Sequence, residues 1–147
     1  MFAIEPGRWA GKSRLYLEGA AGPHSESDST LEVAAGVNPT AREIRYGWSH
    51  EGQPQRGVLL IAAHPKDHSV TAAWLDSWHQ GVSVMFSSGE AAAHGFSVRG
   101  SYAVPGHPDW FWRIAIEAAP DRLRLTMYNI SPDGEEHLAV SADYSPA

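Results

Sequence analysis

The chain has 147 residues, no cysteine and a formal net charge of -6, with 43% hydrophobic and 19% charged residues. This length suits a single globular domain over residues 1–147, and the lack of cysteine excludes disulfides, thiolate nucleophiles and thiolate-bound metals. The acidic balance argues against nucleic-acid binding, because phosphate recognition needs a basic surface.

Glycine and proline divide the chain into segments of strand length, with 14 glycines and 10 prolines. Within the segments apolar and polar residues alternate, as in Leu123-Arg124-Leu125-Thr126-Met127, which is the period of a strand with one buried face. The alanine-rich segment Ser88 to Ala93 is compatible with one helical turn. The pattern predicts about ten strands, near residues 8–17, 27–36, 41–50, 56–63, 69–78, 82–87, 94–104, 109–118, 122–131 and 135–144.

The connections between these strands are short and contain turn residues, as in Pro65-Lys66-Asp67 and Ser131-Pro132-Asp133-Gly134. Short connections favour antiparallel hairpins, and a twisted sheet of this size protects its edges by closing on itself. We therefore predict an all-β fold, a single antiparallel up-and-down barrel. A β-sandwich is the alternative, although it normally requires longer crossover connections.

Three motifs, taken in order, carry a resemblance to a known family. Gly7-Arg8-Trp9-Ala10-Gly11 opens the first predicted strand, Ala73-Trp74-Leu75-Asp76-Ser77 lies in mid-chain, and Asp133-Gly134-Glu135 precedes a last strand that ends in Tyr144. Together they resemble a bacterial family of lipocalin-like (calycin) domains of unknown function over nearly the whole chain. The resemblance implies a calycin barrel and no particular reaction, with Trp9 packing at the closed end.

Alternate residues of a barrel strand face the interior, so the apolar set of each strand predicts the lining. This lining is aromatic with a few polar groups, as in small-molecule sites, and it predicts a small hydrophobic or aromatic ligand. The alternative is that the same side chains fill the barrel as a solid core. The predicted ligand-binding residues are Tyr46, Trp48, Trp74, Asp76, Phe96, Tyr102, Trp110, Trp112, Met127 and Asn129.

Asp76 is the charged residue predicted on this inner face, where an unpaired carboxylate would be costly. One interpretation makes it a structural carboxylate that fixes the strand end, either through hydrogen bonds or by pairing with an arginine, for which Arg45, Arg99 and Arg113 are candidates. The other makes it a general base, alone or with His50, in a cofactor-free enzyme. The pKa of Asp76 distinguishes them, because a base needs a raised pKa and a paired carboxylate has a lowered one.

Histidines raise two further hypotheses. His64 and His68 flank a turn, but the sequence identifies no third ligand, so we predict no metal site. The opening motif is also similar to that of nitrobindin-like barrels, which bind haem through a histidine, and this makes His137 a candidate. The alternation of the last strand places Leu138, Val140 and Tyr144 inside and His137 outside, although a bulge would reverse this.

These patterns lead to one function and several alternatives. We expect no catalytic residue and no cofactor, and the partner we expect is a small hydrophobic or aromatic molecule, with a homodimer as a further possibility. The alternatives are the cofactor-free enzyme, the haem-binding barrel and a filled barrel that acts through its surface. No apolar run reaches membrane-span length and residues 1–7 do not resemble a signal peptide, so we expect a cytoplasmic protein that binds neither membrane nor nucleic acid.

Overall fold

The computed structural model describes residues 4–17 and 21–147, and these residues form ten β-strands and no helix. No helix in this part of the chain is therefore long and apolar enough to cross a membrane. Residues 1–3, where the segment compared with signal peptides begins, lie outside the described residues. The strands are β1 (Gly7–Leu15), β2 (Ser25–Ala35), β3 (Ala41–His50), β4 (Gln53–Ala63), β5 (Ser69–Asp76), β6 (Met85–Ala92), β7 (Gly95–Tyr102), β8 (Trp110–Ala119), β9 (Arg122–Ile130) and β10 (Glu136–Pro146).

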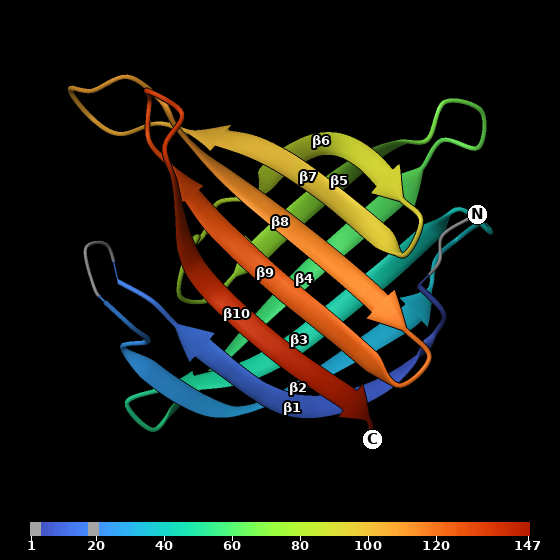
Figure 1. Ribbon diagram of the computed structural model, residues 1–147. Helices are drawn as coiled ribbons and strands as arrows, with labels where there is room; N and C mark the ends of the chain where they lie inside the picture. The colour runs from blue at the N-terminus through green and yellow to red at the C-terminus, as the bar shows by residue number, and fades with distance from the viewer. Residues whose placement is uncertain (1–3, 18–20) are drawn as a thin grey trace.

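The strands form one closed antiparallel barrel, as predicted (Figure 1). Each strand pairs with its neighbours in the chain, and β1 closes the barrel against β10 with Trp9 opposite Pro146. We call the end where β1, β3, β5, β7 and β9 finish the mouth. It lies on the left in Figure 1, and the start of β1 and the end of β10 lie at the opposite end.

The segment Ser88 to Ala93, which the sequence left compatible with one helical turn, belongs mostly to a strand, so the predicted end of that strand at residue 87 was wrong. Strand β6 runs on to Ala92, and it pairs with β5 on one side and with β7 on the other. Ladder hydrogen bonds to two neighbours outweigh the low strand preference of glycine and alanine. The preceding strand is shorter than predicted, because β5 ends at Asp76 and a turn follows.

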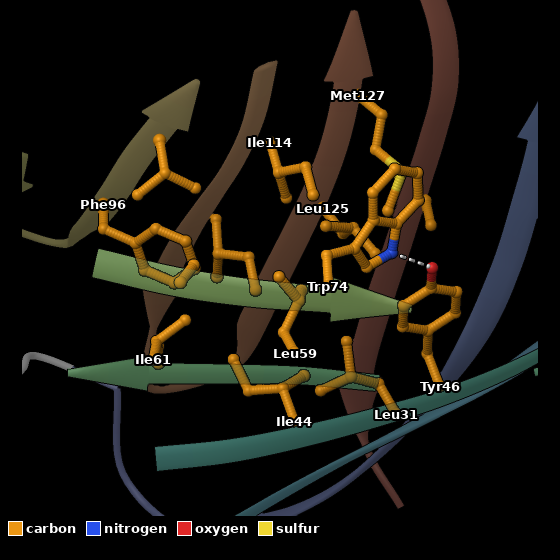
Figure 2. Packing of buried hydrophobic residues seen from close by; sticks show 14 of the residues in the cluster. Leu31, Ile44, Tyr46, Leu59, Ile61, Trp74, Phe96, Ile114, Leu125 and Met127 are labelled. Atoms are coloured by element: carbon orange, nitrogen blue, oxygen red, sulfur yellow. Dashed lines mark hydrogen bonds between the residues drawn. The ribbon is translucent and has the colours of Figure 1, made fainter. Parts of the chain in front are cut away.

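Large apolar side chains fill the barrel between the mouth and the closed end (Figure 2). Trp74 is 1% exposed and Phe96 2% exposed, and both pack in this cluster. At the closed end Ile4 is buried, and its carbonyl oxygen accepts a hydrogen bond from Arg42 Nε at 2.9 Å. The half-buried Trp9 packs against the same core, as expected from the resemblance. Within the interior of the barrel, the described side chains therefore leave room for a ligand only near the mouth.

A bulge in β10 changes which residues of this strand face inward. The pairing of β10 with β9 shifts between Leu138 and Val140. Beyond the shift Val140 lies opposite Met127 and is buried, as predicted. Before the shift His137 lies opposite Asn129, so the alternation that placed His137 outside the barrel was wrong. One extra residue thus turns the imidazole towards the mouth.

A pocket at the mouth of the barrel

Asp76 ends β5 and is 1% exposed. Its Oδ1 accepts hydrogen bonds from the backbone N–H groups of Trp78 at 2.7 Å and His79 at 2.8 Å. Its Oδ2 accepts a hydrogen bond from the Tyr46 hydroxyl at 2.6 Å. The carboxylate thus begins the turn after β5 by bonding the backbone that follows it, which is a common role of aspartate in turns.

The predicted arginine partners of Asp76 were wrong. Arg45 pairs with Glu43 at 2.5 Å, and Arg113 pairs with Glu136 at 2.8 Å. The guanidinium carbon of Arg99 lies over the Phe111 ring, 4.1 Å from its centre. The alternation that places Asp76 on the inner face places these three arginines on the outer face, which explains why none of them reaches it.

A chain of hydrogen bonds links the carboxylate to the core. The Trp74 indole Nε1 donates to the Tyr46 hydroxyl oxygen at 2.9 Å (Figure 2). That hydroxyl in turn donates to Asp76. Tyr46, Gly57 and Asp76 lie side by side on adjacent strands. A Cβ at Gly57 would lie 2.0 Å from Tyr46 Cζ, so the tyrosine ring can cross β4 only because residue 57 is glycine.

The pKa of Asp76 is shifted in the direction expected of a structural carboxylate. Burial alone would raise this pKa, but the hydrogen bonds and charge of His79 and the hydrogen bond from Tyr46 outweigh burial and hold the pKa below its ordinary value. Burial, followed by the neighbouring Asp76 charge, raises the pKa of Tyr46 well above 10. At neutral pH Asp76 is therefore charged and Tyr46 is neutral.

His79 presents an unpaired nitrogen at the mouth. Its side chain is 9% exposed, and its Nδ1 lies 3.3 Å from Asp76 Oδ1. A carboxylate only accepts hydrogen bonds, so Nδ1 carries the proton that it donates. In the neutral imidazole with its proton on Nδ1, Nε2 has a free lone pair. This buried Nε2 has no hydrogen-bond partner.

Aromatic rings surround this imidazole. The centre of the His79 ring lies 5.2 Å from that of Trp112, 4.7 Å from that of Trp78 and 5.7 Å from that of Trp48. Trp112 is stacked on Trp74 at 5.5 Å, with 11° between the ring planes. Trp112 is 8% exposed, and its buried indole Nε1 also has no hydrogen-bond partner.

An open pocket of about 180 Å³ lies at the mouth, between the aromatic rings, the end of β1 and the start of β10. Deeper in the barrel a void of about 10 Å³ lies beside Asp76 and Met127, which is close to the space of a single water molecule. The pocket is lined by Leu15, Tyr16, Leu17, Trp78, His79, Trp112, Asn129, His137, Leu138 and Ala139.

The predicted ligand-binding residues occupy three places. Trp112 and Asn129 line the mouth pocket. Tyr102 donates from its hydroxyl to Asn129 Oδ1 at 2.6 Å, and the half-buried Trp110 lies opposite Tyr102 at the start of β8. The others lie beside the pocket or deeper in the core, and their contact with a ligand stays a prediction. They are Tyr46, Trp48, Trp74, Asp76, Phe96 and Met127.

His79 is a site residue that the sequence did not predict. A strand over residues 69–78 would leave His79 just after its end, on the face opposite Asp76. In the structure β5 ends at Asp76, and the turn brings His79 back over the mouth. The sequence feature that could have indicated this position is the histidine three residues after Asp76. An aspartate at the end of a strand often begins a turn by bonding the backbone that follows it.

Within residues 4–17 and 21–147 no group of three or more histidine, aspartate or glutamate side chains is placed to hold a metal ion. His64 and Asp67 instead form a local contact, with Nδ1 and Oδ1 3.2 Å apart. The fold and the site together define a closed ten-stranded barrel with a filled interior and an aromatic pocket at one end.

The chain belongs to the family described as "Protein of unknown function (DUF1579)", whose model matches residues 2–145. This match covers nearly all of the barrel, including every strand that forms the mouth. No curated protein matches the sequence. The family description assigns no activity, so a function has to be argued from the pocket itself.

Proposed function

We propose that the protein is a lipocalin-like barrel that binds one small aromatic molecule in the mouth pocket. The observation that carries this proposal is the combination of an open volume of about 180 Å³ with aromatic walls and buried, unpaired ring nitrogens. Apolar walls with a few convergent polar groups are typical of small-molecule sites. A cavity of roughly 150 Å³ holds a benzene ring in other proteins, so the volume suits a single substituted ring.

The filled interior limits where this ligand lies. The buried side chains of Trp74 and Phe96 fill the space below the pocket. The void that remains inside the barrel has a volume of about 10 Å³. The ligand therefore contacts Trp78, Trp112 and Asn129 at the mouth rather than the centre of the barrel. The proposal combines the two interpretations of the aromatic lining. Most of these side chains form a solid core, and the ligand site is confined to one end of the barrel.

The pocket does not fit a haem. His137 lines the pocket and its Nε2 lies 4.0 Å from Glu135 Oε1, so an imidazole is present at the mouth. A volume of about 180 Å³ is, however, below the roughly 300–1,000 Å³ of pockets for drug-sized ligands. A macrocycle of four pyrrole rings would have to displace the aromatic side chains that form the mouth.

Nuclear magnetic resonance tests this proposal, with toluene as the probe and the six tryptophan indole N–H signals as reporters. We expect the signals of Trp78 and Trp112 to shift as toluene is added, because their rings line the pocket. The signal of Trp9, at the closed end, is the internal control and should stay in place. Equal small shifts of all signals, or none at millimolar toluene, would contradict the proposal.

Native mass spectrometry of gently purified protein provides a second test. A discrete added mass that disappears on denaturation would identify a natural ligand that fits the pocket. Replacing Trp112 with leucine should reduce the fraction that carries this mass, because Trp112 forms a wall of the pocket. If the mass remained on this variant, the ligand would lie elsewhere on the protein.

A further inference from the structure

We infer that the mouth pocket selects a ring that carries a neutral hydroxyl group, a phenol, through His79 Nε2 and Trp112 Nε1. The inference deepens the proposed function and rests on it. Two buried nitrogens of the same pocket lack hydrogen-bond partners, and a buried polar atom left unpaired is costly. One nitrogen accepts a hydrogen bond and the other donates one, and this difference specifies the polar group of the ligand.

His79 Nε2 is the acceptor of the pair. Asp76 accepts the Nδ1 proton at 3.3 Å and is itself held by Tyr46 and by the backbone of the turn. This network fixes the imidazole in the tautomer whose Nε2 has a free lone pair. Asp76 is thus a positioning residue that acts through His79.

Trp112 Nε1 is the donor of the pair, because an indole N–H can only donate. Its ring is fixed by stacking on Trp74 and lies beside the His79 ring, with 5.2 Å between the ring centres. A ligand atom that reaches both nitrogens has to donate one hydrogen bond and accept another.

A hydroxyl oxygen meets this requirement with one atom, since its proton goes to Nε2 and its lone pair accepts from the indole N–H. A carboxylate only accepts, and it would place a second negative charge near Asp76 and a lone pair against Nε2. An ammonium group only donates, and it would leave Trp112 unpaired. The ring of a phenol would then pack against the apolar side chains of Leu15 and Ala139.

Four probes of similar size distinguish these cases. They are p-cresol, which donates and accepts; 4-methylanisole, which only accepts; toluene, which does neither; and p-toluate, which is anionic. We expect p-cresol to bind roughly tenfold more tightly than each of the others, in line with the cost of leaving buried polar groups unpaired. Dissociation constants come from the shifts of the Trp112 indole signal.

Two variants assign the preference to its residues. His79→Phe keeps a ring and removes the acceptor, and Trp112→Phe keeps a ring and removes the donor. Each should bring the affinity for p-cresol close to that for toluene, measured with the Trp78 signal in the second variant. Trp112→Phe breaks no hydrogen bond within the protein, so it keeps the test valid if His79→Phe does not fold. Trp110→Phe is the matched control and should keep the preference, because Trp110 does not line the pocket.

The outcomes separate the inference from the proposed function. Equal binding of p-cresol, 4-methylanisole and toluene would overturn the inference and leave an aromatic pocket. Preference for p-toluate would overturn it as well, because it would require a protonated His79. If no probe bound at millimolar concentration, the inference and the proposed function would both be wrong.

Discussion

The Tyr46 ring occupies the space that a side chain at residue 57 would fill, since a Cβ on Gly57 would lie 2.0 Å from Tyr46 Cζ. This relationship holds the tyrosine hydroxyl between Trp74 and Asp76. The bonds that position His79 at the mouth therefore depend on the absence of a side chain at residue 57 of the neighbouring strand, β4.

Gly57→Ala should lower the free energy of unfolding by about 1–3 kcal/mol, because the added methyl group displaces a packed ring. The measurement is urea denaturation followed by tryptophan fluorescence. Gly47→Ala is the matched control on the neighbouring strand. Its Cβ would come no closer than 3.4 Å to Thr30 Oγ1, so it should change the stability by less than about 1 kcal/mol. Equal effects of the two substitutions would show that the Tyr46 ring does not lie against residue 57.

Tyr46→Phe should cost about 1–3 kcal/mol, because it removes a donor to Asp76 and leaves the Trp74 N–H buried without an acceptor. A double-mutant cycle with Trp74→Phe isolates the second effect. If the bond from Trp74 matters, the double variant should be more stable than the sum of the single losses predicts. Strictly additive losses would show that the indole N–H finds another partner.

The stability of the protein should fall in acid partly through Asp76. Its folded-state pKa lies below the ordinary value of 3.8, so the stabilisation is fully present above that value and disappears as the pH falls through the folded-state pKa. Asp28 and Asp67 also have lowered pKa values, so the difference between wild type and Asp76→Asn isolates the contribution of Asp76. We expect this difference in unfolding free energy to shrink as the pH is lowered below about 4. A constant difference would contradict the lowered pKa.

Two tyrosines should resist ionisation in the folded protein. Burial raises the pKa of Tyr144 to about 12, and the pKa of Tyr46 is also well above 10. An ultraviolet titration of the native protein should therefore show fewer than its five tyrosines ionised at pH 11. Unfolded tyrosines ionise near pH 10 and release protons that the folded state retains, so the stability should fall as the pH rises above about 10. In the ultraviolet titration, Tyr144→Phe should remove the ionisation step near pH 12.

The barrel could be predicted because alternation is a local property that a closed sheet preserves. Leu123, Leu125 and Met127 follow each other on one face of β9, and all three are buried. The end of β6 could not be predicted in this way. Ala91 and Ala92 have little strand preference, and their pairing with Phe96 and Gly95 of β7 decides their conformation.

The positions of the polar site residues depend on a bulge and a turn, which the alternation of apolar and polar residues does not predict. The inward position of His137 follows from one extra residue in β10, for which the sequence has no distinct signal. The environment of Asp76 follows from a turn in which the carboxylate bonds to its own following backbone. The arginines predicted as partners of Asp76 lie elsewhere, whereas the partners that the structure shows are Tyr46, Trp78 and His79.

The order of the strands has a consequence for how the protein assembles. Among the described residues, nine of the ten strand pairings join strands that follow each other in the chain, and the pairing of β1 with β10 alone joins its two ends. A growing sheet can therefore add one hairpin at a time, but it exposes two unpaired edges until that last contact forms. Such edges recruit other chains. Protection from aggregation thus depends on the contact between β1 and β10, and substitutions that weaken it should promote aggregation more than equally destabilising changes within any hairpin.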